Sequence, residues 1–224
     1  MDSVAPGHPG ELAQHGYVVL TDAALGISDE DRHLLRKRYF TTDVLRRYPN
    51  DIPHDRLRAR DVLRYDWTST DVTLREHTTI DIIDRGGHAG TRTFHRTPVA
   101  TDDIITRWVR GILHAIPPQH RQPRGTFGLN FFRTFTDVVT EPHQDGEEYI
   151  VVYVIAKSGT GAMTELYDLS GALVLKHELL PGELILFRDD RFRHNATPLQ
   201  PLDSPTHRDA MVCTVNYATT YPLD

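Results

Sequence analysis

Cysteine, excess positive charge and long apolar runs are all scarce in this sequence. Its single cysteine, Cys213, cannot form a disulfide within the chain. The neighbouring Met211, Val212 and Val215 predict a buried strand, in which a free thiol packs like a small apolar side chain. The formal net charge of −6 argues against general binding to nucleic acid, because that affinity comes mostly from neutralising phosphates.

Signals for membranes and secretion are also lacking. No run of apolar residues approaches the length of a membrane span. Residues 1–15 are polar, without the charged and apolar regions of a signal peptide. We therefore expect a cytoplasmic protein that binds neither a membrane nor nucleic acid. The sequence predicts no oligomeric state.

The composition is that of a globular protein. The chain has 224 residues, of which 39% are hydrophobic and 25% charged, enough to bury a sizeable core. This length is compatible with one large domain or with two small ones. Because the sequence contains neither an internal repeat nor a linker, one domain over residues 1–224 is predicted.

The second half of the chain is rich in short apolar runs separated by turn residues. These runs are residues 126–135, 149–156, 163–167, 173–179, 184–187 and 211–217. Closely spaced antiparallel strands of this kind predict a mainly β fold, a jelly roll or a related double-sheet fold. We expect this core at about residues 125–218.

The first half predicts helices that cover one outer face of the strands. Ser28 caps a helix that runs to about Tyr48 and ends at Pro49. A second helix, capped by Thr101, carries an apolar stripe over residues 104–116. Between them, residues 56–84 predict irregular strands, and the role of the arginine-rich segment 56–75 stays open.

A His-X-Asp pair and a distant histidine form the most informative pattern. His143 and Asp145 alternate, so in an extended segment both side chains point to the same side. His194 follows a predicted strand far downstream, and only a folded sheet can bring it back to them. Two imidazoles and one carboxylate, with other positions open, suit non-haem Fe(II) and its oxygen chemistry.

The alternative is that the pattern arises by chance. The chain has 13 histidines, so a short His-X-Asp can occur in a solvated acidic loop, with His194 simply at the surface. The order of elements favours a metal site instead. A strongly β run follows His143 and Asp145, and Arg208 precedes the last predicted strand.

Three segments in this order resemble a known family. They read PHQDG at 142–146, DDRFRHNATP at 189–198 and RD at 208–209. Together they are similar to the Fe(II)- and 2-oxoglutarate-dependent dioxygenases of the double-stranded β-helix fold, and within these to the bacterial subfamily that includes the free L-isoleucine hydroxylases. The resemblance covers residues 126–217, whereas the first half matches only loosely.

The resemblance implies a set of ligands and a reaction. His143, Asp145 and His194 would hold Fe(II), and Arg208 would grip the distal carboxylate of the cosubstrate 2-oxoglutarate with its guanidinium fork. Asn130, which interrupts a β run just before the metal segment, is assigned to the same cosubstrate site. Dioxygen would then convert 2-oxoglutarate to succinate and CO₂ while a substrate C–H bond is oxidised. Related halogenases have a small residue at the position of Asp145, so its carboxylate favours hydroxylation.

The substrate prediction is a free amino acid or a similar small metabolite, hydroxylated at an unactivated C–H bond. Three residues are predicted to contact the substrate. Arg133 would pair with its carboxylate, Tyr65 would form a wall of the pocket, and Asp189 would pair with its ammonium group. The arginines at 58, 60 and 64 offer further partners for a carboxylate. Two alternatives remain: the same chemistry on a carrier-tethered amino acid or a peptide, and a non-catalytic metal-binding β-barrel module. The position and stereochemistry of oxidation, and any second oxidation, stay open.

Overall fold

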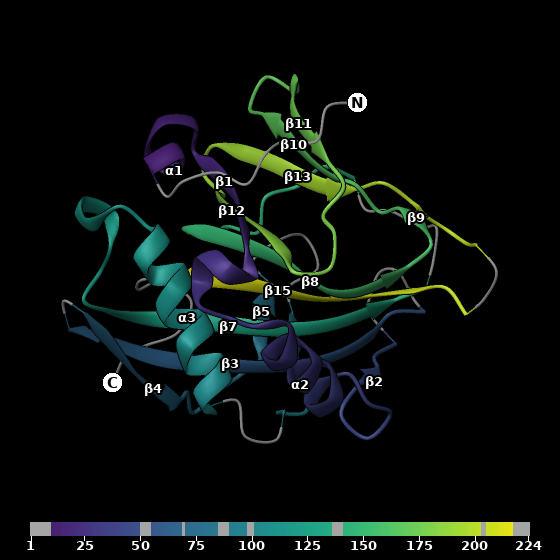
Figure 1. Cartoon of the computed structure of the whole chain (residues 1–224), viewed down its shortest axis with the longest axis horizontal. Helices are drawn as coiled ribbons and strands as arrows, with labels where there is room; N and C mark the ends of the chain where they lie inside the picture. Colours follow the sequence, from purple (N-terminus) through teal and green to yellow (C-terminus); the bar gives the residue numbers. More distant parts are fainter. Residues whose placement is uncertain are drawn as a thin grey trace.

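Two antiparallel sheets that face each other form most of the protein (Figure 1). The computed structural model describes residues 10–49, 55–68, 70–84, 90–97, 101–135, 141–202 and 205–216. The large sheet has the order β1-β12-β8-β15-β7-β3-β2, with β4 paired to β3, and the small sheet has the order β11-β10-β13. The predicted mainly β jelly roll with flanking helices is confirmed.

The described elements fall into helices and strands as follows. The helices are α1 (Gly10–His15), η1 (Asp22–Leu25), α2 (Asp29–Tyr39), α3 (Asp103–Ala115) and η2 (Pro118–His120). The strands are β1 (Tyr17–Thr21), β2 (Arg46–Arg47), β3 (Leu57–Thr68), β4 (Asp71–Glu76), β5 (Ile82–Asp84), β6 (Gly90–Arg92), β7 (Arg124–Thr134), β8 (Tyr149–Ser158), β9 (Thr160–Gly161), β10 (Thr164–Asp168), β11 (Leu173–His177), β12 (Glu183–Arg188), β13 (Phe192–Ala196), β14 (Leu199–Gln200) and β15 (His207–Asn216).

The face of the large sheet that meets the small sheet is called the inner face here. Alternate residues of its strands, among them Ile150, Val152 and Ile185, pack against Leu166 and Phe192 of the small sheet. Continuing the same alternation along β7, β3 and β15 puts the even-numbered residues 128–132, 58–62 and 208–214 on this face. The inner face is therefore apolar beside the small sheet and more polar towards β3.

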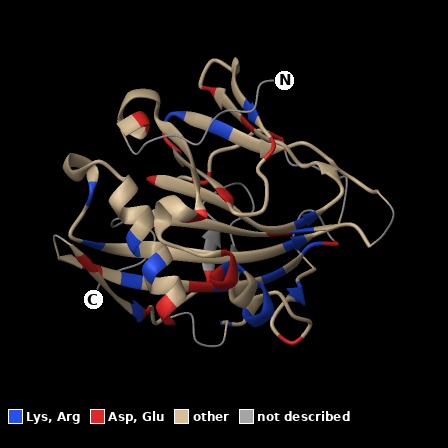
Figure 2. Ribbon diagram, viewed as in Figure 1, with Lys and Arg blue, Asp and Glu red and all other residues tan. Residues whose placement is uncertain are grey.

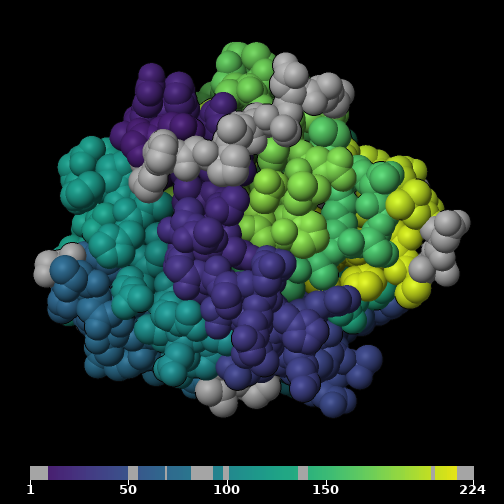
Figure 3. Space-filling view, viewed as in Figure 1, coloured from purple at the N-terminus to yellow at the C-terminus, as the bar shows by residue number. Residues whose placement is uncertain are grey.

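The opposite, outer face of the large sheet is covered by helices. The apolar stripe of α3 packs here on side chains such as Phe127, Tyr153 and Met211. The N-terminal segment, purple in Figure 3, runs over the same side of the molecule beside α3 (teal). Cys213 is buried on this face, as its apolar neighbours predicted.

Strands from the first half extend the large sheet well beyond the predicted core. β1 pairs with β12 at one edge, and β3 pairs with β7 over ten consecutive residues. Residues 56–84 form strands, as predicted, but the predicted irregularity is wrong for β3, which is a long, regular strand. In β3, Arg58 and Arg60 alternate with residues that point to the other side of the sheet, such as Ala59. This period of two is typical of a strand whose two faces have different surroundings.

Both main helices differ from the prediction at one end. Ser28 caps α2 in a capping box with Asp31, as predicted, but the helix ends at Tyr39, before Pro49. The chain turns immediately after it, where the backbone N–H of Leu45 donates to the carbonyl of Thr41. In α3 the cap is Asp102, one residue after the predicted Thr101, because its carboxylate accepts the backbone N–H of Ile105.

Two further findings concern individual elements. β13 was not predicted, although it carries His194 in the small sheet, where His194 pairs with Leu166. Its five residues, FRHNA, are apolar only at the two ends, so the sequence lacks the alternation that marks a strand. Residue 217 of the last predicted run lies outside the described residues. No described helix combines the length and the apolar character that a membrane span requires.

The stripe of α3 supplies a test of this packing. Ile112 is fully buried between the helix and the outer face. We expect Ile112→Ala to lower the free energy of unfolding by about 2–5 kcal/mol, since it leaves a cavity as well as losing apolar burial. Urea denaturation measures this loss. Arg110→Ala, on the solvent side of the same helix, should change stability by about 0.5 kcal/mol or less; equal losses would contradict the packing.

Candidate metal centre

Three side chains from two distant segments converge at one edge of the space between the sheets. The loop before β8 supplies His143 and Asp145, and β13 supplies His194. One ligand atom from each lies within 4.8 Å of the others. The Nε2 atoms of His143 and His194 each lie 3.7 Å from an oxygen of Asp145. The predicted triad is therefore assembled.

Backbone pairing brings the two histidines together. His143 and His194 form an isolated antiparallel bridge, in which each backbone N–H donates to the other's carbonyl at 3.1 and 2.8 Å. Their imidazole rings lie 4.6 Å apart between centroids. This bridge attaches the His-X-Asp segment to the small sheet beside β13.

The surroundings of the histidines suit a cation. Nδ1 of His143 lies 2.9 Å from the carbonyl oxygen of Glu141, which can only accept, so in the neutral ring the proton lies on Nδ1 and Nε2 has the lone pair. Burial lowers the pKa of His194, although the Asp145 carboxylate opposes the shift. Neutral imidazole and carboxylate are the forms that bind metals. The donor set and its convergence therefore fit a divalent iron.

Arg208 lies at the start of β15 with its side chain on the inner face. The nitrogen atoms Nε and Nη2 are buried and have no hydrogen-bond partner among the described residues. Burial, together with the nearby charge of Arg56, lowers the pKa of Arg208 to about 10, so the group stays cationic at neutral pH. Such a buried, unpaired guanidinium fork fits a carboxylate ligand.

Asn130 lies on the same face, on the neighbouring strand β7. Its side-chain oxygen accepts from Nη1 of Arg60 at 2.7 Å, and its amide nitrogen donates to the carbonyl of Val212 at 3.1 Å. Arg60 also donates through Nε to the carbonyl of Ile80. Asn130 therefore holds a buried arginine in the wall of the inner face.

Two predicted substrate residues lie on the outer face instead. Arg133 donates to both carboxylate oxygens of Asp209 at 2.6 and 2.7 Å and to the carbonyl of Phe40. Tyr65 is buried in the core beneath α3, where its ring covers Gly125. The large sheet separates both side chains from the inner face, so the substrate roles predicted for Arg133 and Tyr65 do not fit their positions.

Asp189, the third predicted substrate residue, is close to the triad but not open to solvent. Its side chain is 1% exposed, and one carboxylate oxygen accepts two backbone N–H groups of the loop that carries Asp145. A group held in this way is not available to an ammonium ion. Asp189 therefore holds the loop that carries Asp145 and does not face the open side of the triad.

Sequence reasoning missed an arginine–aromatic cluster on the inner face. Phe132 lies between Arg56 and Arg58, whose guanidinium carbons are 4.5 and 4.6 Å from the ring centroid. Arg58 also lies 5.0 Å from the ring centroid of Phe94. The sequence held a signal, since Arg58 and Arg60 alternate within β3 and Arg56 directly precedes this strand. The signal can be interpreted only once residues 57–68 are known to form a strand.

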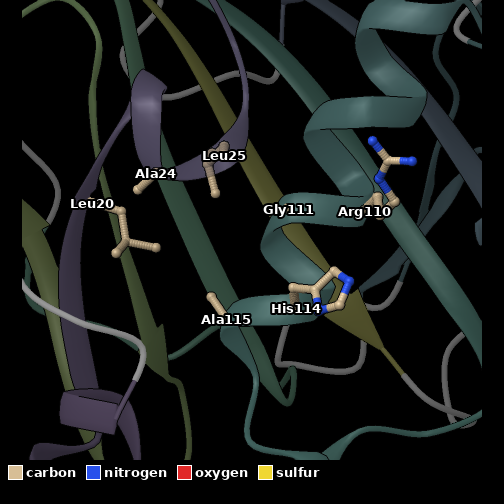
Figure 4. Close-up of a pocket in the computed structure, with 7 residues that line it drawn as sticks. All are labelled: Leu20, Ala24, Leu25, Arg110, Gly111, His114 and Ala115. Atoms are coloured by element: carbon tan, nitrogen blue, oxygen red, sulfur yellow. The ribbon is translucent and has the colours of Figure 1, made fainter. Parts of the chain in front are cut away.

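A separate hollow of about 340 Å³ lies on the outer side, between η1 and α3 (Figure 4). It is lined by Leu20, Ala24, Leu25, Arg110, Gly111, His114 and Ala115. The core cluster beneath α3 contains Leu20, Leu25 and Ala115, which places the hollow across the sheet from the triad. It is not part of the metal centre.

The position of Arg133 leads to a test that separates a structural role from a substrate role. Asp209 is fully buried, so Arg133→Ala leaves its carboxylate with the weaker partner Arg36, whose Nε lies 3.3 Å away. We expect a loss of about 3 kcal/mol in the free energy of unfolding, as for other broken buried ion pairs. Below its unfolding temperature, the variant should keep the wild-type metal affinity. A stable variant with weakened metal binding would contradict this assignment.

Solved structures with the same fold cover nearly the whole chain. A bsmA homolog from Methylobium petroleophilum PM1 superposes with a TM-score of 0.82 at 19% identity, covering 98% of each chain. IDO from Bacillus thuringiensis gives a TM-score of 0.67 at 16% identity over 98% of this chain and 99% of that one. A prolyl-4-hydroxylase from Pseudomonas putida gives 0.57 at 12% identity, covering 94% and 97%. Identities this low establish the fold alone.

Sequence comparison identifies the family. No curated protein matches the sequence. The family model for 2OG-Fe dioxygenases matches residues 91–214, more than half of the chain, and this span includes the triad and Arg208. Enzymes of this family use Fe(II), 2-oxoglutarate and O₂, which agrees with the two-histidine, one-carboxylate centre and excludes the alternative of a non-catalytic module. The chain belongs to the 2OG-Fe dioxygenase family.

Proposed function

We propose that this dioxygenase hydroxylates a C–H bond of a free amino acid or a similar small carboxylate, as the resemblance to the L-isoleucine hydroxylases implies. The observation that carries the proposal is the group of arginines on the inner face, where Arg58 and Arg60 lie on the same face as Arg208. The Nε and Nη2 atoms of Arg208 have no protein partner among the described residues, and the distal carboxylate of 2-oxoglutarate would satisfy them in two parallel hydrogen bonds. The further positive charge on this face favours a second carboxylate, that of the substrate.

Each residue of the centre has a defined task. His143, Asp145 and His194 would hold the iron through Nε2, a carboxylate oxygen and Nε2. When bound, iron with 2-oxoglutarate and O₂ supplies the oxidising chemistry, which belongs to the cofactor and not to the protein. Arg208 would bind the distal carboxylate of 2-oxoglutarate, and Asn130 would keep Arg60 in the adjoining wall. The carboxylate of Asp145 favours hydroxylation over halogenation.

The basic character of the inner face supports a substrate with a carboxylate. Figure 2 shows Lys and Arg, in blue, gathered at one end of the large sheet on β2, β3, β7 and β15. On the inner face this gathering consists of Arg58, Arg60 and Arg208, with Arg56 next to them. Arg208 would serve 2-oxoglutarate, and the guanidinium of Arg58, which lies against the rings of Phe132 and Phe94, would attract the carboxylate of the substrate.

A second candidate is the same reaction on a tethered amino acid or a peptide. The side chains of His143 and Asp145 are 43% and 38% exposed, so the centre is accessible at the surface of the described structure. The fold is shared with a protein named as a prolyl-4-hydroxylase. An extended substrate would lie across this open side rather than inside a closed pocket.

The role of Arg208 can be tested through the binding of 2-oxoglutarate. Arg208→Ala should raise its KM roughly 10- to 100-fold, because a charge-assisted pair worth about 1.5–3 kcal/mol is lost. Arg208→Lys keeps the positive charge but not the guanidinium fork, so its KM for 2-oxoglutarate should lie between those of Arg208→Ala and the wild type. The measurement is the visible charge-transfer absorption of the Fe(II)–2-oxoglutarate complex, titrated anaerobically, alongside succinate formation.

Two controls accompany this titration. Arg47→Ala removes an exposed arginine on the edge strand β2 of the same sheet and should leave 2-oxoglutarate binding unchanged. His143→Ala should remove iron binding altogether. Wild-type affinity for 2-oxoglutarate in Arg208→Ala would disprove the assignment of Arg208.

The substrate class can be tested with free amino acids and their amides. At least one free L-amino acid should stimulate succinate formation, whereas its α-carboxamide, which lacks the carboxylate, should not stimulate it. Arg58→Gln should raise KM for the stimulating amino acid roughly 10- to 100-fold and leave KM for 2-oxoglutarate nearly unchanged. Arg75→Ala, exposed on β4, is the matched control. Stimulation by peptides but by no free amino acid would replace the first candidate with the second.

A further inference from the structure

We propose that Asp189 is the positioning residue of the metal centre, which fixes both the Asp145 loop and the proton-bearing nitrogen of His194. Asp189 lies in the turn between β12 and β13 and is 1% exposed. The role of this residue in catalysis rests on the function proposed above, whereas its effect on metal binding can be measured without any substrate.

One oxygen of Asp189 holds the loop that carries a metal ligand. Oδ2 accepts the backbone N–H groups of Gly146 at 2.6 Å and Glu147 at 3.0 Å, directly after Asp145. The side-chain amide of Gln144 donates to the carbonyl of Asp189, and the backbone N–H of Asp189 donates to Glu148. Four hydrogen bonds thus tie residues 144–148 to this single residue.

The other oxygen of Asp189 faces a second metal ligand. Oδ1 lies 3.9 Å from Nδ1 of His194, while Nε2 of the same ring faces Asp145. Both Oδ1 and Nδ1 are buried, and neither has a hydrogen-bond partner among the described residues. The separation is too long for a hydrogen bond. A rotation of the imidazole that brings Nδ1 within hydrogen-bond distance of Oδ1 would satisfy both atoms at once.

Burial explains why the carboxylate of Asp189 needs a hydrogen-bond donor at His194. A buried carboxylate is costly unless its oxygens accept hydrogen bonds. Among the described ion-pair contacts, the basic side chain that faces Asp189 is His194 rather than a lysine or an arginine. The adjacent Asp190 shows the contrast, since it points outward, is 58% exposed and pairs with Arg188.

The chemical consequence is control of the tautomer. A carboxylate accepts a hydrogen bond, so it keeps the proton of a neutral imidazole on Nδ1 and leaves the lone pair of Nε2 for the metal. For His143 the carbonyl of Glu141 does the same task. Both histidines therefore present Nε2 before a metal arrives.

Asp189→Asn separates the two roles. The asparagine oxygen can still accept from the N–H groups of Gly146 and Glu147, which preserves the loop. Its amide then places a donor opposite Nδ1 of His194, which favours the tautomer with the proton on Nε2. That tautomer cannot bind a metal through Nε2.

The experiment measures metal binding by the full chain, with anaerobic Fe(II) titration and Co(II) absorption as a spectroscopic probe. We expect Asp189→Asn to unfold in urea like the metal-free wild type, yet to bind Fe(II) about 10- to 100-fold more weakly. The Co(II) spectrum should change in shape. Asp190→Asn, the neighbouring exposed carboxylate, should match the wild type in all three measurements.

A second measurement does not depend on the variant folding. In metal-free wild type carrying ¹⁵N-labelled histidine, nuclear magnetic resonance should show His194 protonated on Nδ1. Protonation on Nε2 would overturn the proposal, as would wild-type Fe(II) affinity in a folded Asp189→Asn. Failure of the wild type to bind Fe(II) would overturn the proposed function as well, so the two failures are distinguishable.

Discussion

Two backbone hydrogen bonds between His143 and His194 are the constraint on which the metal centre depends. They join a loop before β8 to β13, segments that the chain separates by most of the small sheet. Because the bridge is antiparallel, the two imidazoles lie side by side and the carboxylate of Asp145, two residues on, reaches both. Asp189 holds the same loop from behind, so the ligands are placed before a metal binds.

The large sheet separates structural charges from functional ones. Arg208 and Asp209 are consecutive in β15 and therefore point to opposite faces. On the inner face, the buried Nε and Nη2 of Arg208 have no partner among the described residues; on the outer face, Asp209 is buried with Arg133 and Arg36. The ion pairs of Asp209 hold the start of β15 against the helical side, and this fixes the backbone from which Arg208 extends.

Much of the core and of the metal centre was predictable because the signals are local. The alternation of His143 with Asp145, the strands of the second half and the apolar stripe of α3 each follow from the period of one element. The arginine–aromatic cluster was not predictable in the same way. It needs β3, a strand of the first half, to pair with β7, and this pairing brings Arg58 to Phe132 from a distant part of the sequence.

The sequence by itself determined which residue types were available: two histidines and a carboxylate for iron, and arginines for carboxylates. Only the tertiary structure decided which of them act together. Alternation along a strand shows that Arg133 and Arg208 point to the opposite side from the residues next to them. It does not show which face of the sheet packs on the helices and which faces the small sheet. The same holds for Tyr65, which lies beneath α3, and for Asp189, whose partners come from a loop more than forty residues earlier. Partner choice is set by strand pairing and sheet packing, which are contacts between distant segments and leave no local period in the sequence.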